Sequence, residues 1–144
     1  MANFKPISDG IFIGPQPAEQ DLKEAKQLGI QTVIDMRMPG ESNTSNQELT
    51  RSNDLGYVNV PVNKLALAEH QIDDLEHAMA RSPAPYLLHC ATGARAALLL
   101  SLSRARQMGW TAEQTFQEAQ GMGFNLKDSD NFAGFVRKPL PLAR

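Results

Sequence analysis

The chain has 144 residues, and its 14 Lys and Arg residues against 16 Asp and Glu residues leave a net charge of -2, with one cysteine in total. This length fits one domain, so we expect residues 1–144 to form one, and the balanced charge gives no general reason to expect nucleic acid or an anionic membrane as a partner. No apolar run approaches the ~18 residues of a membrane span. A single cysteine cannot form an internal disulfide, and residues 1–10 lack a secretory signal. We therefore expect a cytoplasmic protein unless an export segment precedes this sequence.

Strands and helices alternate along the sequence. Apolar or β-branched runs between turn residues predict short buried strands, and apolar residues at a spacing of three or four predict helices. In chain order, the predictions are a strand at residues 11–14, a helix at 17–30, a strand at 31–36, a helix at 46–56, a strand at 57–62, a helix at 69–82, a strand at 86–90 and helices at 95–109 and 111–123. The tail from Asn125 has no clear assignment, but its Phe132, Phe135 and Val136 are predicted to cover the core.

This alternation predicts an α/β fold with a central, mostly parallel sheet and helices on both faces. Ligands of such sheets bind where strands end and helices begin. Cys90 lies at one of these junctions, between the strand at 86–90 and the helix that follows. We therefore expect Cys90 at the carboxyl end of a central strand, with a binding site around it.

Two interpretations of Cys90 are open at this stage. Free cysteine is among the most buried residue types and often only fills a core. The residues after Cys90 favour a chemical role, because Gly93 permits a tight turn whose backbone N–H groups point inward and attract an anion. A helix that begins near Arg95 would add its N-terminal N–H groups, and both features favour the reactive thiolate.

Arg95 is the second candidate for a chemical role. It could hold an oxyanion with two parallel hydrogen bonds, which lysine cannot do because it lacks the planar fork. Helix N-termini ordinarily favour acidic residues, so an arginine at this position is most simply explained by an anionic ligand. We therefore expect phosphate or sulfate to bind the loop from Cys90 to Arg95.

The stretch around Cys90 resembles the signature of the cysteine-dependent protein phosphatases, which consists of a histidine and the cysteine at a strand end, a phosphate-binding loop, an arginine and a helix. The corresponding residues here are His89, Cys90, the loop residues Ala91, Thr92, Gly93 and Ala94, and Arg95. The upstream stretch "IFIGPQPAEQDLKEAKQLGIQTVIDMRMPGE" resembles the dual-specificity-like phosphatases and, more closely, a bacterial family of small phosphatase-like domains found alone or fused to β-lactamase-like hydrolases. The resemblance extends from about Ile7 to Phe124 and implies a cysteine-phosphatase-like fold, with a single phosphatase-like domain over residues 1–144.

The resemblance also implies a mechanism, the hydrolysis of phosphate monoesters by a phosphatase of the protein tyrosine or dual-specificity type. Cys90 would attack the phosphorus and form a thiophosphoryl enzyme, which water would then hydrolyse. Loop N–H groups and Arg95 would stabilise charge on the equatorial oxygens. His89 would orient the loop, and Asp35 and Arg37 would pair with and brace neighbouring loops. The substrate is then a phosphorylated molecule whose type the sequence leaves open.

The chain departs from the phosphatase pattern at three places. The superfamily normally has five residues between the cysteine and the arginine, and here there are four. Ala96 stands where many members have a serine or threonine that helps to break the thiophosphoryl bond, although the Thr92 hydroxyl could replace it. Asn63 stands where the general acid, an aspartate, is expected.

Other candidates for the general acid follow Asn63 in the sequence. Glu69 and His70 are near enough along the chain to substitute for the aspartate, whereas Asp73 and Asp74 are expected on a solvated helix face. An aryl leaving group needs little protonation, so we expect slow hydrolysis of aryl phosphates and much poorer hydrolysis of alkyl phosphates.

Two alternative functions stay open. Rhodanese-like sulfurtransferases also use a cysteine at a strand end and typically have a shorter anion-binding loop, so the four-residue spacing permits a persulfide on Cys90. A phosphatase fold that binds phosphate or sulfate without turnover is also compatible with the missing acid. His70 and His77 have no cysteine or set of carboxylates nearby, so we expect no metal, and no cofactor is implied.

Overall fold

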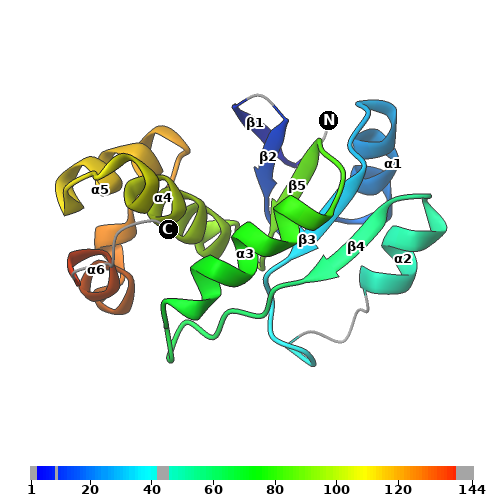
Figure 1. Ribbon diagram of the computed structural model, residues 1–144. Helices are drawn as coiled ribbons and strands as arrows, with labels where there is room; N and C mark the ends of the chain where they lie inside the picture. The colour runs from blue at the N-terminus through cyan, green and yellow to red at the C-terminus, as the bar shows by residue number, and fades with distance from the viewer. Residues whose placement is uncertain (1–2, 9, 42–45, 139–144) are drawn as a thin grey trace.

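The fold is organised around a five-stranded sheet with the strand order β1-β2-β5-β3-β4 (Figure 1). The computed structural model describes residues 3–8, 10–41 and 46–138. The strands are β1 (Lys5–Ser8), β2 (Ile11–Gly14), β3 (Thr32–Asp35), β4 (Gly56–Asn59) and β5 (Tyr86–His89). Strands β2, β5, β3 and β4 are parallel, and β1 runs antiparallel to β2. The predicted mostly parallel sheet is confirmed.

The sequence predicts β2, β3 and β5 closely but not the two edges of the sheet. The strand expected at 57–62 is β4, which begins and ends earlier. No pattern predicts β1, because most of its residues are exposed and carry no alternation of apolar side chains. Pro6 within it removes one backbone donor, which is tolerated on an edge strand.

The helices occupy the segments between and after the strands. They are α1 (Glu19–Gln27), α2 (Asn46–Ser52), α3 (His70–Arg81), α4 (Ala94–Met108), α5 (Ala112–Gly121) and α6 (Asp130–Arg137), with a short 3-10 helix, η1 (Leu126–Asp128), before α6. The tail that lacked an assignment therefore forms η1 and α6. The Ser129 hydroxyl caps α6 by accepting a hydrogen bond from the Phe132 N–H at 3.3 Å. Phe132, Phe135 and Val136 are buried, as expected.

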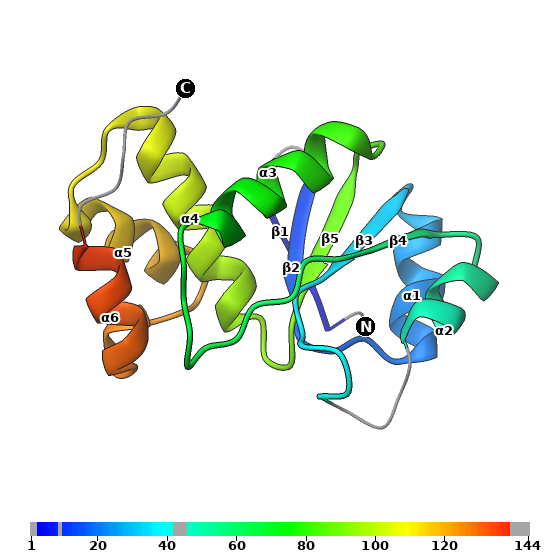
Figure 2. The ribbon, with the colours of Figure 1, turned by 60° about the horizontal axis from the view of Figure 1, so that its bottom comes forward.

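Helices cover both faces of the sheet. Helices α1 and α2 lie on one face, α3 and α4 lie on the other, and α5 and α6 pack beyond α4 (Figures 1 and 2). Successive strand residues point to opposite faces. Val33 of β3 packs toward α1, in a cluster with Leu22, while its neighbour Ile34 joins the larger core cluster on the α3 and α4 side. The predicted arrangement of helices on both faces is confirmed.

The carboxyl ends of the parallel strands form one row. Gly14 of β2 pairs with His89 of β5, His89 pairs with Asp35 of β3, and Asp35 pairs with Asn59 of β4. Cys90 follows His89 directly, so it leaves the middle strand of the sheet at this edge, as predicted. None of the helices in the described ranges is long and apolar enough to cross a membrane.

Candidate active site

The loop after Cys90 folds back onto the cysteine. Cys90 is only 1% exposed, and its sulfur accepts a hydrogen bond from the Gly93 N–H at 3.0 Å. Ala91 and Thr92 are exposed at the tip of the loop, and α4 begins at Ala94. The Ala91 carbonyl accepts a hydrogen bond from the Gln16 N–H at 3.1 Å, so the loop between β2 and α1 holds the cysteine loop in place.

Gly93 is required by the shape of this loop. Its φ is 101°, in the left-handed region that favours glycine. A Cβ at this position would lie 2.7 Å from Cζ of Phe124 and 3.3 Å from the Gly14 carbonyl oxygen. The first distance is too short for two carbon atoms, so any side chain at Gly93 would displace Phe124 or reshape the loop.

Replacing Gly93 with alanine is therefore expected to destabilise the protein by about 1–3 kcal/mol, because the left-handed backbone and the contact with Phe124 both oppose a Cβ. Urea denaturation of both proteins measures the difference in the free energy of unfolding. Gly121→Ala is the matched control, since a Cβ there meets no atom within 4 Å and the φ is ordinary. A Gly93→Ala protein as stable as the control would show that the loop does not depend on this glycine.

Arg95 is held by two groups from other loops. Its Nη1 and Nη2 donate to the two carboxylate oxygens of Glu41 at 2.7 and 2.5 Å, and Nη1 also donates to the Val62 carbonyl at 2.9 Å. The Glu41 carboxylate raises the pKa of Arg95 above its ordinary value, burial opposes this rise, and the neighbouring Cys90 side chain adds to it. The guanidinium is thus fixed beside the cysteine.

Glu41 is a partner of Arg95 that the sequence did not indicate. The protein itself supplies a carboxylate to Arg95, in addition to the anionic ligand expected from the sequence. The hydrogen bond from Arg95 lowers the pKa of Glu41 to about 2, against the smaller effect of burial. Glu41 is therefore ionised at neutral pH and cannot be the general acid. Its role in the described structure is to orient the guanidinium.

Asp35 and Arg37 form a second layer behind the loop. Arg37 donates to both carboxylate oxygens of Asp35, at 3.0 and 2.9 Å, and the Tyr57 hydroxyl donates to Asp35 at 2.8 Å. Burial alone would raise the pKa of Asp35, but these hydrogen bonds and the nearby His89 lower it below its ordinary value. Asn59 donates to the backbone carbonyls of Asp35 and Arg37, which fixes the loop that leads toward Glu41.

His89 is fully buried beneath the cysteine. Its Nδ1 lies 3.3 Å from the Cys90 carbonyl and 3.9 Å from an Asp35 oxygen, and its Nε2 has no hydrogen-bond partner within the described ranges. Burial lowers the pKa of His89 to about 4, although Asp35 opposes the shift. The imidazole is neutral at pH 7, with the Nδ1 hydrogen available for the Cys90 carbonyl.

The buried His89 makes stability depend on pH. Its pKa falls from an ordinary value of 6.5 to about 4 on folding, so the unfolded chain binds the proton more tightly and stability falls as the pH drops through this window. Between pH 7 and pH 5 we expect a loss of about 2 kcal/mol in the free energy of unfolding. Urea denaturation at both pH values measures it. His89→Asn should lose most of this pH dependence, and an unchanged dependence would contradict the assignment. The stability that the ionised Glu41 contributes is lost mainly below pH 4.5, the ordinary pKa of glutamate, so it changes little between pH 7 and pH 5.

Most candidates for the general acid have hydrogen-bond or ion-pair partners of their own. Asp73 forms an ion pair with Arg106 at 2.8 Å, and Arg106 lies 11 residues after Arg95 on α4, about 16 Å further along the helix. His70 is exposed and faces Asp74 at 3.1 Å. Asn63 accepts a hydrogen bond from the Leu65 N–H within its own turn.

Glu69, Ala96 and Thr92 are the other residues named for the missing acid and hydroxyl. Glu69 precedes α3 and caps it without a side-chain hydrogen bond. Ala96 is buried, and the Thr92 hydroxyl accepts from the Ala94 N–H at 3.2 Å. Thr92 is thus part of the loop, while no candidate acid contacts it. Within the described ranges, no group of three His, Cys, Asp or Glu residues is placed to hold a metal.

Two residues of the site were missed from the sequence. Glu41 was quoted only as the end of an upstream motif, although a buried arginine at a helix N-terminus calls for a carboxylate partner. Phe124, which lies against Gly93, comes from the segment after α5 and carries no signal that connects it with the loop.

Comparison with known proteins identifies the family. The sequence pattern of the family described as "Beta-lactamase hydrolase-like protein, phosphatase-like domain" matches residues 3–107, which include the whole loop from Cys90 to Arg95. The chain belongs to this family. The beta-lactamase hydrolase-like protein of Xylella fastidiosa is 26% identical over 125 residues, which cover 83% of this chain and 29% of that protein. The chain therefore spans less than a third of the length of this curated relative.

Solved structures agree with this family in fold. A putative phosphatase from Neisseria meningitidis superimposes over 94% of this chain and 96% of its own, with a TM-score of 0.77 and 26% identity. TpbA from P. aeruginosa, solved in complex with pTyr, covers 94% of this chain and 83% of its own, with a TM-score of 0.73 and 18% identity. At that identity the likeness shows the fold alone. The resemblance to bacterial cysteine-phosphatase-like proteins is confirmed.

Proposed function

We propose that this chain is a hydrolase of phosphate monoesters in which Cys90 is the nucleophile, and that residues 1–144 form one phosphatase-like domain. The observation that carries the proposal is the arrangement at the sulfur, which accepts the Gly93 N–H at 3.0 Å and interacts with the Arg95 guanidinium at the start of α4. N–H donors at a helix N-terminus with a neighbouring cation form a binding site for an anion such as a phosphoryl group. Membership of the phosphatase-like family supports the same reaction.

The reaction has two steps in this proposal. First, the Cys90 sulfur attacks the phosphorus, a sulfur–phosphorus bond forms, and the bond from phosphorus to the leaving oxygen breaks, so that this oxygen takes up a proton from solvent. Second, a water oxygen attacks the phosphorus, the sulfur–phosphorus bond breaks, and inorganic phosphate leaves Cys90 as a thiolate again. Loop N–H groups and Arg95 stabilise the charge that develops on the equatorial oxygens.

Glu41 and Val62 contribute by holding Arg95. A guanidinium that is already oriented loses little rotational freedom when it binds the equatorial oxygens, and such preorganised charge is the main source of transition-state stabilisation in sites of this kind. Arg95 is 7% exposed, so its charge acts in a partly desolvated setting. Arg95 therefore acts on the phosphoryl group directly, and Glu41 acts only by orienting Arg95.

The leaving group is best an aryl oxygen. Glu41 is ionised, Asp73 pairs with Arg106 and Asp74 faces His70, so none of these three carboxylates is available to protonate a leaving alkoxide. A phenolate leaves with little protonation, whereas an alkoxide does not. Aryl phosphates such as phosphotyrosine, which was bound to the P. aeruginosa protein, are the substrate class that fits.

Sulfur transfer is the second candidate function, because the loop holds four residues between Cys90 and Arg95. A persulfide on Cys90 would use the same N–H groups. The third candidate, phosphate binding without turnover, differs from the first only in the absence of catalysis.

One experiment separates these candidates. The protein is incubated with para-nitrophenyl phosphate, with phosphoserine and with thiosulfate, and products and intact protein mass are followed. We expect release of nitrophenol, much slower hydrolysis of phosphoserine, and a transient phosphoryl group on the protein. Faster turnover of thiosulfate with one sulfur atom added to Cys90 would establish the sulfurtransferase. Binding of phosphate with no turnover of any substrate would establish the binding module.

A further inference from the structure

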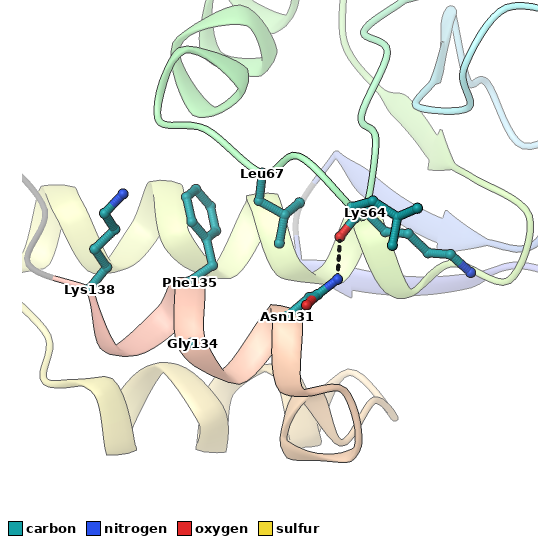
Figure 3. A pocket seen from close by; sticks show the side chains of 7 residues that line it. Lys64, Leu67, Asn131, Gly134, Phe135 and Lys138 are labelled. Carbon is teal, nitrogen blue, oxygen red and sulfur yellow. Dashed lines mark hydrogen bonds between the residues drawn. The ribbon is translucent and has the colours of Figure 1, made fainter.

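A groove lies between the segment that follows β4 and helix α6 (Figure 3). It has a volume of about 260 Å³. The lining residues are Lys64, Leu65 and Leu67 from the segment between β4 and α3, and Asn131, Gly134, Phe135 and Lys138 from the end of the described chain. The reaction proposed above uses none of them.

The groove is continuous with the site through the backbone. The Val62 carbonyl accepts from Arg95, and Lys64 comes only two residues later. The Lys64 carbonyl in turn accepts a hydrogen bond from the Asn131 side chain at 3.0 Å, which fixes this segment against α6. The groove therefore begins two residues along the chain from the carbonyl that holds Arg95.

The charges of the groove favour an acidic occupant. Lys64 and Lys138 stand at its two ends, with Leu67 and Phe135 between them (Figure 3). Both lysines are exposed, and neither forms an ion pair with another residue of the described ranges. No acidic side chain lines the groove. Leu65, at its rim, is 78% exposed, so apolar surface is also left uncovered.

The dimensions of the groove fit a short peptide segment. Asn131 and Lys138 are seven residues apart on and just after α6, which corresponds to about 10 Å along the helix. An extended chain spans roughly 3.3–3.6 Å per residue, so about three residues fit along α6 between Asn131, which holds the Lys64 carbonyl, and Lys138. The volume accommodates one apolar side chain or the stems of acidic ones but not a drug-sized molecule.

We propose that this groove, formed by Lys64, Leu67, Phe135 and Lys138, binds an acidic segment of about three residues next to the phosphorylated tyrosine of a protein substrate. The proposal rests on the proposed function and names its substrate class. The two ammonium groups attract carboxylates at both ends of the segment, and the apolar middle packs against the methylene groups between them.

The test compares phosphotyrosine peptides that carry three Glu, three Gln or three Lys residues on either side of the phosphotyrosine. We expect kcat/KM to be about tenfold higher for the Glu peptide than for the Gln peptide at low ionic strength, and this preference to shrink in salt. The variant Lys64→Glu/Lys138→Glu should remove or invert the preference. Lys23→Glu, the same type of replacement at one lysine of α1 on the opposite face of the sheet, should retain it. Turnover of para-nitrophenyl phosphate serves as the reference for each variant.

A second pair of variants tests the space rather than the charge. A Cβ at Gly134 meets no atom within 4 Å, so Gly134→Leu should fold while its side chain fills the groove, and Gly134→Ala should leave the groove open. We expect the leucine variant to lose the preference for the Glu peptide and the alanine variant to keep it. Equal kcat/KM for the Glu and Gln peptides in the unchanged protein, with normal turnover of para-nitrophenyl phosphate, would overturn the groove proposal alone.

A binding measurement tests the groove even if the protein proves not to be a phosphatase. If para-nitrophenyl phosphate is not hydrolysed, fluorescence anisotropy with the Cys90→Ser protein still compares the affinities for the three labelled peptides. Tighter binding of the Glu peptide supports the groove, and equal affinities overturn it. Self-association that Gly134→Leu abolishes would also overturn it, because a second copy of the chain would then occupy the groove.

Discussion

Replacing Cys90 with serine is expected to abolish hydrolysis of para-nitrophenyl phosphate, with a loss of at least about 10⁴-fold in kcat. A serine hydroxyl is a far weaker nucleophile than the sulfur of cysteine, and the Gly93 N–H that donates to this position does not compensate for the difference. Steady-state kinetics measure the loss. Intact mass is equally direct, because the chain has a single cysteine and only Cys90 can carry a thiophosphoryl group.

The loss of activity counts only if the Cys90→Ser protein is folded. Serine is close in size to cysteine, but the site is 1% exposed, so the unfolding transition of Cys90→Ser must be compared with that of the parent protein. Binding of inorganic phosphate should persist, since Arg95 and the loop N–H groups are unchanged. A folded Cys90→Ser protein that keeps more than about a tenth of the parent activity would show that another group is the nucleophile.

The sequence could predict the position of Cys90 because that position depends on local patterns. Buried strands such as β5 are continuous apolar runs, and parallel strands present their carboxyl ends at one edge. Gly93 could be connected with a tight turn from its residue type alone. These arguments involve neighbours in the sequence, and the structure confirms the strand, the turn and the following helix, which begins at Ala94, one residue before the predicted start.

The partner of Arg95 could not be predicted in the same way. Glu41 is 54 residues away, and the two meet only because the loops after β3 and β5 leave adjacent strands at the same edge. Many carboxylates could satisfy an arginine, and the sequence does not say which loop comes close enough. The result changes the interpretation of the arginine, which is held by the protein before any ligand binds.

The outer elements β1 and α6 were missed for a different reason. The four residues of β1 lie on an edge and are mostly exposed, so they show no apolar alternation. Helix α6 has only eight residues, which is short for recognition from spacing, although Phe132, Phe135 and Val136 identify its buried face. Both elements owe their conformation to the parts of the fold on which they pack.

Replacing Arg95 with lysine is expected to lower kcat/KM for para-nitrophenyl phosphate by about 10²–10³-fold, which is roughly 3–4 kcal/mol of transition-state stabilisation. The lysine keeps the charge but has one nitrogen, so it cannot hold Glu41 through two nitrogens and still direct a donor at the equatorial oxygens. Its ammonium should instead pair with Glu41.

The control is Arg104→Lys, a change of the same chemistry on the same helix, at an arginine that pairs with Glu118 at 2.6 Å and lies away from the loop. Its kcat/KM should change less than about twofold, because a partly exposed ion pair contributes little and takes no part in the reaction. The Arg95→Lys variant also distinguishes phosphate hydrolysis at Cys90 from sulfur transfer. A tetrahedral dianion needs the planar fork, whereas a persulfide carries its charge on sulfur and needs only the N–H groups. If Arg95→Lys lowered phosphate and thiosulfate turnover equally, the loss would reflect a distorted loop, and the role of Arg95 on the equatorial oxygens would be wrong.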